Sequence, residues 1–189
     1  MNNNIKISQN PTWVIQTLMF FKTHYLIVLA LGMAAAMGRV IQLGAFGPIS
    51  AALHLVLEII IEGARLMIFA YALGLTNVRK GFARIMQIFT KRGAWKSNWN
   101  IAKARMKSDW KSLLMSMVIY LLIAWVINLL IDYTAYQTCL HYKLKVNRII
   151  SEGASEWVII LFFKNLSVIP LTLIFNAVFL LWITGRVKN

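Results

Sequence analysis

The chain contains few of the residues from which most reactive centres are built. It has one cysteine, Cys139, and three histidines, at positions 24, 54 and 141, which lie far apart in the sequence. A single cysteine excludes an intrachain disulfide and a metal site made of several thiolates. The sequence also lacks a glycine-rich phosphate loop, an HEXXH motif and a nucleophile elbow. We therefore expect no cofactor, no bound metal and no catalytic residue of these kinds.

Charged residues are also scarce, and most of them carry one sign. Only 14% of the 189 residues are charged, whereas 59% are hydrophobic. Because a typical soluble domain has about 25% charged residues, this composition indicates a membrane protein. Lysine and arginine number 20 against six acidic residues, which gives a formal net charge of +14. In a soluble protein this excess would suggest nucleic-acid binding, but in a membrane protein it first suggests basic cytoplasmic loops.

Four apolar segments are long enough to cross a bilayer as α-helices. A helix needs about 20 residues to span roughly 30 Å of hydrocarbon, and it satisfies its own backbone hydrogen bonds there. We therefore predict an all-α polytopic membrane protein, with one membrane domain over residues 1–189 and amphipathic helices at the membrane surface. The predicted transmembrane helices cover residues 25–43, 48–74, 113–131 and 157–183.

The N-terminal segment, residues 1–24, contains a further apolar run at 13–23 that ends near Lys22 and His24. A single helix over residues 13–43 would be about 46 Å long, which is more than the bilayer needs. We expect residues 13–23 to form a separate helix at the membrane surface. A single, strongly tilted helix is the alternative.

The distribution of lysine and arginine predicts the orientation. The segment 75–112 carries ten of them and one acidic residue, Asp109, and such segments remain in the cytoplasm. The segment 132–156 has a formal charge of zero and is expected outside. With four spans, both termini are cytoplasmic, including the tail 184–189. We predict a multi-pass protein of the cell (inner) membrane.

The second predicted span contains ionisable residues on one of its sides. At 100° per residue, Glu58, Glu62 and Arg65 lie about 40°, 80° and 20° from His54, and the four groups extend over about 16 Å of helix axis. A charge at the centre of a bilayer costs roughly 2.5 to 3.5 kcal/mol, so these groups need polar partners or water. We predict that this polar stripe faces protein or an aqueous space, and we take it as the candidate functional site.

Partners for the polar stripe are predicted within its own helix and on the fourth span. Glu62 with Arg65, and His54 with Glu58, have the spacing of pairs within one helix. The fourth span runs in the same direction as the second, which places Lys164 where it can pair with Glu58. Pro170 is expected to kink that span and to free a backbone carbonyl. The predicted pathway residues are His54, Glu58, Glu62, Arg65, Lys164, Asn165 and Asn176.

The polar stripe has two interpretations. Its carboxylates could form a pathway for cations or protons, with His54 adding a response to pH near neutrality. Alternatively, the charged groups form a structural network that determines how the helices assemble, and such networks need not be stabilising overall. We favour the pathway because ionisable residues within a membrane are costly and are commonly functional.

The basic segment 75–112 has the pattern of two amphipathic helices. Val78 and Phe82 begin one apolar face, and Trp95 and Trp99 begin another after Gly93. The simplest interpretation places both helices on the cytoplasmic leaflet, with their basic groups on anionic lipids. Recruitment of a cytosolic protein or RNA is the alternative, although no nucleic-acid-binding module is recognisable. The predicted surface residues are Arg79, Lys80, Arg84, Lys91, Arg92, Trp95, Trp99, Lys103, Lys107, Trp110 and Lys111.

These observations lead to one main hypothesis and two alternatives. The main hypothesis is a channel, pore or transporter subunit that works as a homo-oligomer, with the second and fourth spans lining the pathway. The first alternative is a non-conducting membrane anchor or accessory subunit whose basic segment recruits a cytosolic partner. The second is a membrane-embedded enzyme that uses Glu58 as an acid or a base.

Overall fold

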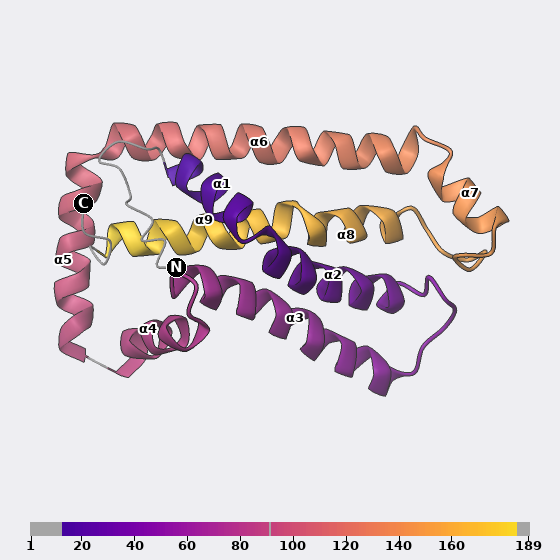
Figure 1. Ribbon diagram of the computed structural model, residues 1–189, viewed down its shortest axis with the longest axis horizontal. Coiled ribbons are helices and arrows are strands. Elements are labelled where there is room, and N and C mark those ends of the chain that lie inside the picture. The colour runs from indigo at the N-terminus through magenta and orange to yellow at the C-terminus, as the bar shows by residue number, and fades with distance from the viewer. Residues whose placement is uncertain (1–12, 91, 185–189) are drawn as a thin grey trace. The chain divides into compact units, whose positions relative to one another are not determined.

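The computed structural model describes residues 13–90 and 92–184, without the side chains of residues 88–97, and all regular structure within it is α-helical (Figure 1). The all-α prediction is therefore confirmed. The described residues belong to two compact units: unit 1 comprises 13–24, 69–90, 92–121 and 173–184, and unit 2 comprises 25–68 and 122–172. The helices are α1 (Trp13–Thr23), α2 (Tyr25–Gln42), α3 (Ala51–Leu73), α4 (Val78–Thr90), α5 (Arg92–Ser108), α6 (Trp110–Tyr136), α7 (Leu140–Val146), α8 (Trp157–Leu166) and α9 (Val168–Ile183).

Three segments of the described chain are long and apolar enough to cross a membrane: α2, α6 and the pair α8 and α9. They coincide with three of the four predicted spans. The second predicted span, 48–74, forms α3. α3 has 23 residues and sufficient length, but it carries Glu58, Glu62 and Arg65 and does not belong to this set. The prediction of four spans is therefore supported for three helices, and the role of α3 depends on how its charges are sheltered.

α6 is longer than predicted and is apolar on all sides. It covers Trp110–Tyr136 rather than 113–131, so that its 27 residues extend over about 40 Å. Within unit 2, Leu122, Trp125 and Leu129 on this helix are 56%, 60% and 47% exposed. These three side chains project within about 60° of one another, and a long apolar helix with an exposed apolar side is typical of contact with lipid.

The fourth predicted span is interrupted at Ser167, which separates α8 from α9. Ser167 has φ −125° and ψ −75°, and its hydroxyl donates to the carbonyl of Phe163 at 2.7 Å. Pro170 follows three residues later and has no N–H to donate to the carbonyl of Leu166. The helix is therefore irregular near the predicted position, and a bend of its axis stays a prediction.

Small residues allow α2 and α3 to pack closely within unit 2. Ala35 of α2 forms a buried cluster with Ile61 and Ala64 of α3. A Cβ atom on Gly38 would lie only 2.8 Å from Cγ1 of Ile61. Small residues at such a contact bring two helices close together, which is common between helices in membranes.

The segment 132–156, predicted as an external loop, is partly helical and is attached to other parts of unit 2. α6 continues to Tyr136, and α7 follows it. The Ser151 hydroxyl donates to the carbonyl of Gly44 at 2.9 Å. The ring of His141 lies 3.0 Å from the carbonyl oxygen of Ala154 and 3.2 Å from the Glu156 carboxylate. These contacts hold the segment against the α2–α3 connection and the start of α8.

In unit 1, α1 is a separate helix, as predicted, because the apolar run 13–43 is divided at His24. One side of α1 packs on the end of α9. The Trp13 ring lies 4.2 Å from that of Trp182 and 5.4 Å from that of Phe179, and Trp13 is 3% exposed. The location of α1 at a membrane surface stays a prediction.

The helices α4 and α5 complete unit 1. Asn77 caps α4 by accepting a hydrogen bond from the backbone N–H of Lys80 at 3.1 Å. Arg84 of α4 donates to the carbonyl of Leu73 at the end of α3. The chain bends at Asp109, and α5 runs across the first turns of α6 rather than along them (Figure 1).

Candidate functional site: a charged network on α2, α3 and α8

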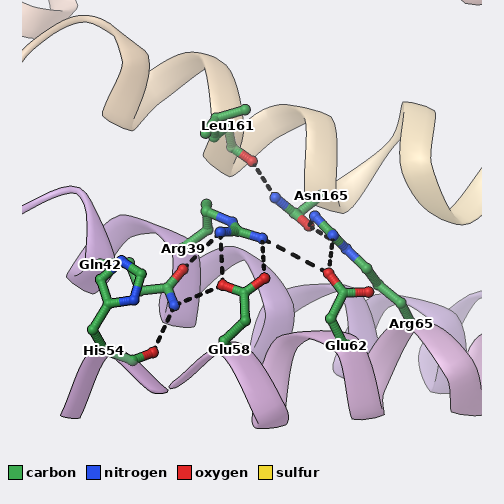
Figure 2. Close-up of polar contacts among 8 residues, drawn as sticks. All are labelled: Arg39, Gln42, His54, Glu58, Glu62, Arg65, Leu161 and Asn165. Carbon is green, nitrogen blue, oxygen red and sulfur yellow. Dashed lines mark hydrogen bonds and ion pairs between the residues drawn. The ribbon is translucent and has the colours of Figure 1, made fainter. Parts of the chain in front are cut away.

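The centre of the site is an ion pair between α2 and α3 in unit 2. Arg39 donates from Nη1 to Oε2 of Glu58 at 3.0 Å and from Nη2 to Oε1 at 3.3 Å (Figure 2). Two parallel charge-assisted hydrogen bonds of this kind define the orientation of both side chains. The pair therefore aligns the C-terminal part of α2 with the middle of α3.

Gln42, one turn after Arg39, extends the network toward the start of α3. Its Nε2 donates to Oε2 of Glu58 and to the backbone carbonyl of His54, each at 2.9 Å, and its Oε1 accepts from Arg39 at 2.8 Å. The carboxylate of Glu58 is thus held by a guanidinium and an amide from the same helix. His54 enters the network through its carbonyl, and the residue itself is exposed.

Glu62 and Arg65 carry the network along α3 to α8. Glu62 lies between two guanidinium groups, 2.5 Å from Arg65 and 3.8 Å from Arg39. Arg65 donates to Oδ1 of Asn165 at 2.8 Å and 3.3 Å. Asn165 is 1% exposed, and its Nδ2 donates to the carbonyl of Leu161 at 2.7 Å, so its polar atoms are all satisfied (Figure 2).

The network is electrically neutral and follows an alternating order. Two guanidinium groups, Arg39 and Arg65, balance two carboxylates, Glu58 and Glu62. Alternation lowers the cost of placing these charges in hydrocarbon, because each charge has an opposite neighbour. Such a network can hold three helices in register, and the oxygens that remain open can attract a cation.

The close packing of α2 against α8 at Gly32 positions the part of α8 that contacts the network. A Cβ atom on Gly32 would lie 3.0 Å from the backbone oxygen of Asn165 and 3.6 Å from Cγ of Pro170. A side chain at this position would crowd the backbone of α8. The contact positions Asn165 where it receives Arg65.

The structure brings Glu58, Glu62, Arg65 and Asn165 into one network, but the predicted partner Lys164 forms no ion pair with it. The predicted Glu62–Arg65 pair is present, and Asn165 contacts Arg65. The predicted pair of Lys164 with Glu58 is wrong, because Glu58 is held by Arg39 and Gln42 and no ion pair of Lys164 occurs among the described residues.

Asn176, the last of the predicted pathway residues, lies on α9 in unit 1, where it is exposed. The pathway role of the whole set remains a prediction.

Arg39 and Gln42 were not among the predicted site residues. Arg39 is the one charged residue in the apolar run 25–43, which is a usable signal because a lone charge in a span requires a partner. Gln42 offers no comparable signal, because an amide near the end of a span is also compatible with water.

The predicted surface residues of the basic segment 75–112 are mostly exposed. Arg84 is partly covered and donates to Leu73, whereas the side chains of Lys91, Arg92 and Trp95 lie outside the described part. The exposed members are Arg79, Lys80, Trp99, Lys103, Lys107, Trp110 and Lys111.

Within residues 13–90 and 92–184, no three histidine, cysteine or acidic side chains come together as metal ligands would. Comparisons of the chain with protein-family models, with curated proteins and with solved structures found no match.

Proposed function

We propose that the protein is a multi-pass membrane protein whose copies assemble around a pathway for cations, lined by the polar stripe of α3. The observation that supports this proposal is an unequal exposure within the network. The side chains of Glu58 and Glu62 are 39% and 54% exposed, whereas those of Arg39 and Arg65 are each 21% exposed. The open edge of the network is therefore formed by carboxylates.

An open carboxylate edge needs a polar environment if α3 crosses the membrane. Hydrocarbon cannot solvate these oxygens, so either water or another copy of the chain must face them. A water-filled space between copies meets this need. Carboxylate oxygens suit hard cations, and the exposed His54 lies at the same edge.

The proposal includes α3 as a fourth span, with the segment 75–112 and both termini on the cytoplasmic side of the cell (inner) membrane. The excess of lysine and arginine in this segment supports the orientation. The α2–α3 connection, which includes the 59% exposed Phe46, is then outside.

The topology can be tested with single cysteines in a Cys139→Ser background. A membrane-impermeant maleimide applied to intact cells should label Phe46→Cys, whereas Ala104→Cys in the basic segment should be labelled only after the cells are opened. If α3 does not cross the membrane, the two positions lie on the same side and react alike. That result would contradict the four-span proposal.

The pathway can be tested by measuring cation flux into liposomes that contain the purified protein. Glu58→Gln with Glu62→Gln keeps the size of both side chains and removes the charge, and it should change the rate or the cation selectivity. Glu152→Gln, which removes an exposed acid from the segment 132–156, is the matched control and should conduct like the parent. Equal flux and selectivity in the double variant and the parent would reject the pathway, provided that both proteins have the same oligomeric size in nanodiscs.

The close pairing of Glu58 with Arg39 and Gln42 favours a second candidate function. In a non-conducting anchor or accessory subunit, the same contacts would only join α2, α3 and α8. This candidate predicts no flux above that of empty liposomes. It also predicts that variants of the polar stripe lose stability while they retain any partner bound by the basic segment.

A further inference from the structure

Within unit 1, α5 lies across the ends of two apolar helices. Its last residue precedes the bend at Asp109, after which α6 begins at once with Trp110. α6 contacts the middle of α9, where the rings of Tyr120 and Phe175 stack at 4.2 Å with an interplanar angle of 13°. Figure 1 shows α5 oriented across this pair. If α6 and α9 cross a membrane, α5 therefore lies along its surface.

The rotation of α5 about its own axis is set by Arg105. Arg105 donates from Nη1 to the backbone carbonyl of Trp182 at 2.6 Å, and its guanidinium carbon lies 5.7 Å from the centre of the Trp182 ring. Ala102, on the same side of α5, is 9% exposed. This side of α5 is consequently occupied by protein. Elsewhere on the described part of the helix, Trp99, Lys103, Ala104, Met106 and Lys107 are exposed.

The tryptophans near this contact indicate the level of the membrane boundary. The Trp182 ring near the end of α9 contacts the Trp13 ring at 4.2 Å, and Trp110 at the start of α6 is 52% exposed. Tryptophan is enriched where hydrocarbon meets the headgroups. Because α5 is attached to Trp182 and adjoins Trp110, it lies at the same level.

The exposed residues of α5 form an apolar edge and a basic edge. Trp99 and Met106 are 62% and 49% exposed, and at 100° per residue they project within about 20° of each other. The exposed Lys103 and Lys107 follow about 40° to 100° further around the helix. Neither α4 nor α5 contains an acidic residue. The surface is thus apolar at one edge and positively charged at the next, and the exposed Asp109 follows at the bend.

We propose that α5 is a docking helix for anionic phospholipid. Trp99 and Met106 enter the boundary between headgroups and acyl chains, while Lys103 and Lys107 contact the phosphate groups. A lipid surface fits better than a protein or RNA because it supplies both the apolar and the anionic component at the level where α5 is held. The proposal depends on α6 and α9 crossing the membrane, and it holds whether or not the polar stripe conducts cations.

The proposal can be tested with a fluorescent label on the full chain in nanodiscs. In a Cys139→Ser background, an NBD label is attached to Met106→Cys or to Ala104→Cys, which is exposed on the opposite side of α5. Nanodiscs contain brominated phosphatidylcholine with increasing fractions of brominated phosphatidylglycerol. Bromine should quench the label at position 106 more strongly than that at position 104, and the difference should grow with the phosphatidylglycerol fraction.

Lysine variants separate lipid binding from a general effect of charge. One lysine near an anionic surface corresponds to about a fivefold change in binding. Lys103→Gln with Lys107→Gln should therefore lose the extra quenching at phosphatidylglycerol fractions that saturate the parent, whereas Lys143→Gln with Lys145→Gln on α7 should not. Equal quenching at positions 104 and 106, or no dependence on phosphatidylglycerol, overturns the proposal. A label at position 106 that no lipid quenches also overturns it and indicates a protein or RNA partner. None of these readouts depends on cation flux.

Discussion

The Arg39–Glu58 ion pair gives the sharpest test of the network, through a double-mutant cycle. Arg39→Gln removes both hydrogen bonds to Glu58 and the contact with Glu62 at 3.8 Å. The network then has one guanidinium and two carboxylates, so its formal charge changes from zero to −1. Glu58→Gln changes it to +1. The double variant returns it to zero, with Glu62 and Arg65 still paired.

The expected free energies follow from this charge balance. Removing one partner of a buried ion pair costs roughly 3 to 5 kcal/mol of unfolding free energy. Because the Glu58 side chain is 39% exposed, we discount this to about 1 to 3 kcal/mol for Arg39→Gln. The double variant should be destabilised by about 1 to 2 kcal/mol less than the sum of the two single variants, which is the range of coupling between residues in contact.

The unfolding free energy can be measured by titrating the protein in mixed micelles with sodium dodecyl sulfate and following tryptophan fluorescence. A cycle of Arg39→Gln with Glu152→Gln, an acid outside the network, supplies the additive control. If the Arg39–Glu58 cycle is also additive within about 0.3 to 0.5 kcal/mol, the two side chains do not interact and the proposed alignment of α2 with α3 is refuted.

Three further predictions concern packing, pH and orientation. Gly32→Ala should lower the unfolding free energy by about 1 to 3 kcal/mol, because its Cβ would lie 3.0 Å from the Asn165 oxygen. Gly63→Ala, whose Cβ would have no atom within 4 Å, is the control and should be neutral or stabilising. Equal losses in both variants would contradict the close contact at Gly32. Burial lowers the pKa of His24 below its usual value, so the unfolded chain binds the proton more tightly and the unfolding free energy should fall as the pH drops below about 6.5. His24→Gln should weaken this dependence between pH 7 and 5, and an unchanged slope would assign it to other groups. The exposed Cys139 of the parent should react with an impermeant maleimide on intact cells, and labelling only after the cells are opened would reverse the proposed orientation.

Much of the fold follows from the sequence because it depends on local properties. Length and apolar composition predicted spans at 25–43, 113–131 and 157–183, and helices long and apolar enough to span a membrane lie at these places, since a helix in hydrocarbon satisfies its own backbone. The Glu62–Arg65 pair was predictable for the same reason, because three residues of helix bring both side chains to one face. Pro170 predicted a kink in the last span, and the structure shows an interruption of the helix at Ser167.

The partners of the polar stripe depend on how separate helices are aligned, and that is a property of the tertiary structure. Close packing at Gly38 and Ile61 sets α2 against α3, and this contact places Arg39 beside Glu58. On α8, neighbouring residues differ by 100° in direction, so the rotation of α8 about its own axis decides that Asn165 rather than Lys164 faces Arg65. The sequence determined that α3 carries charges on one side, because 3.6 residues per turn suffice for that. Only the packing of three helices decided which residues meet those charges, because it depends on side-chain volumes that lie far apart along the chain.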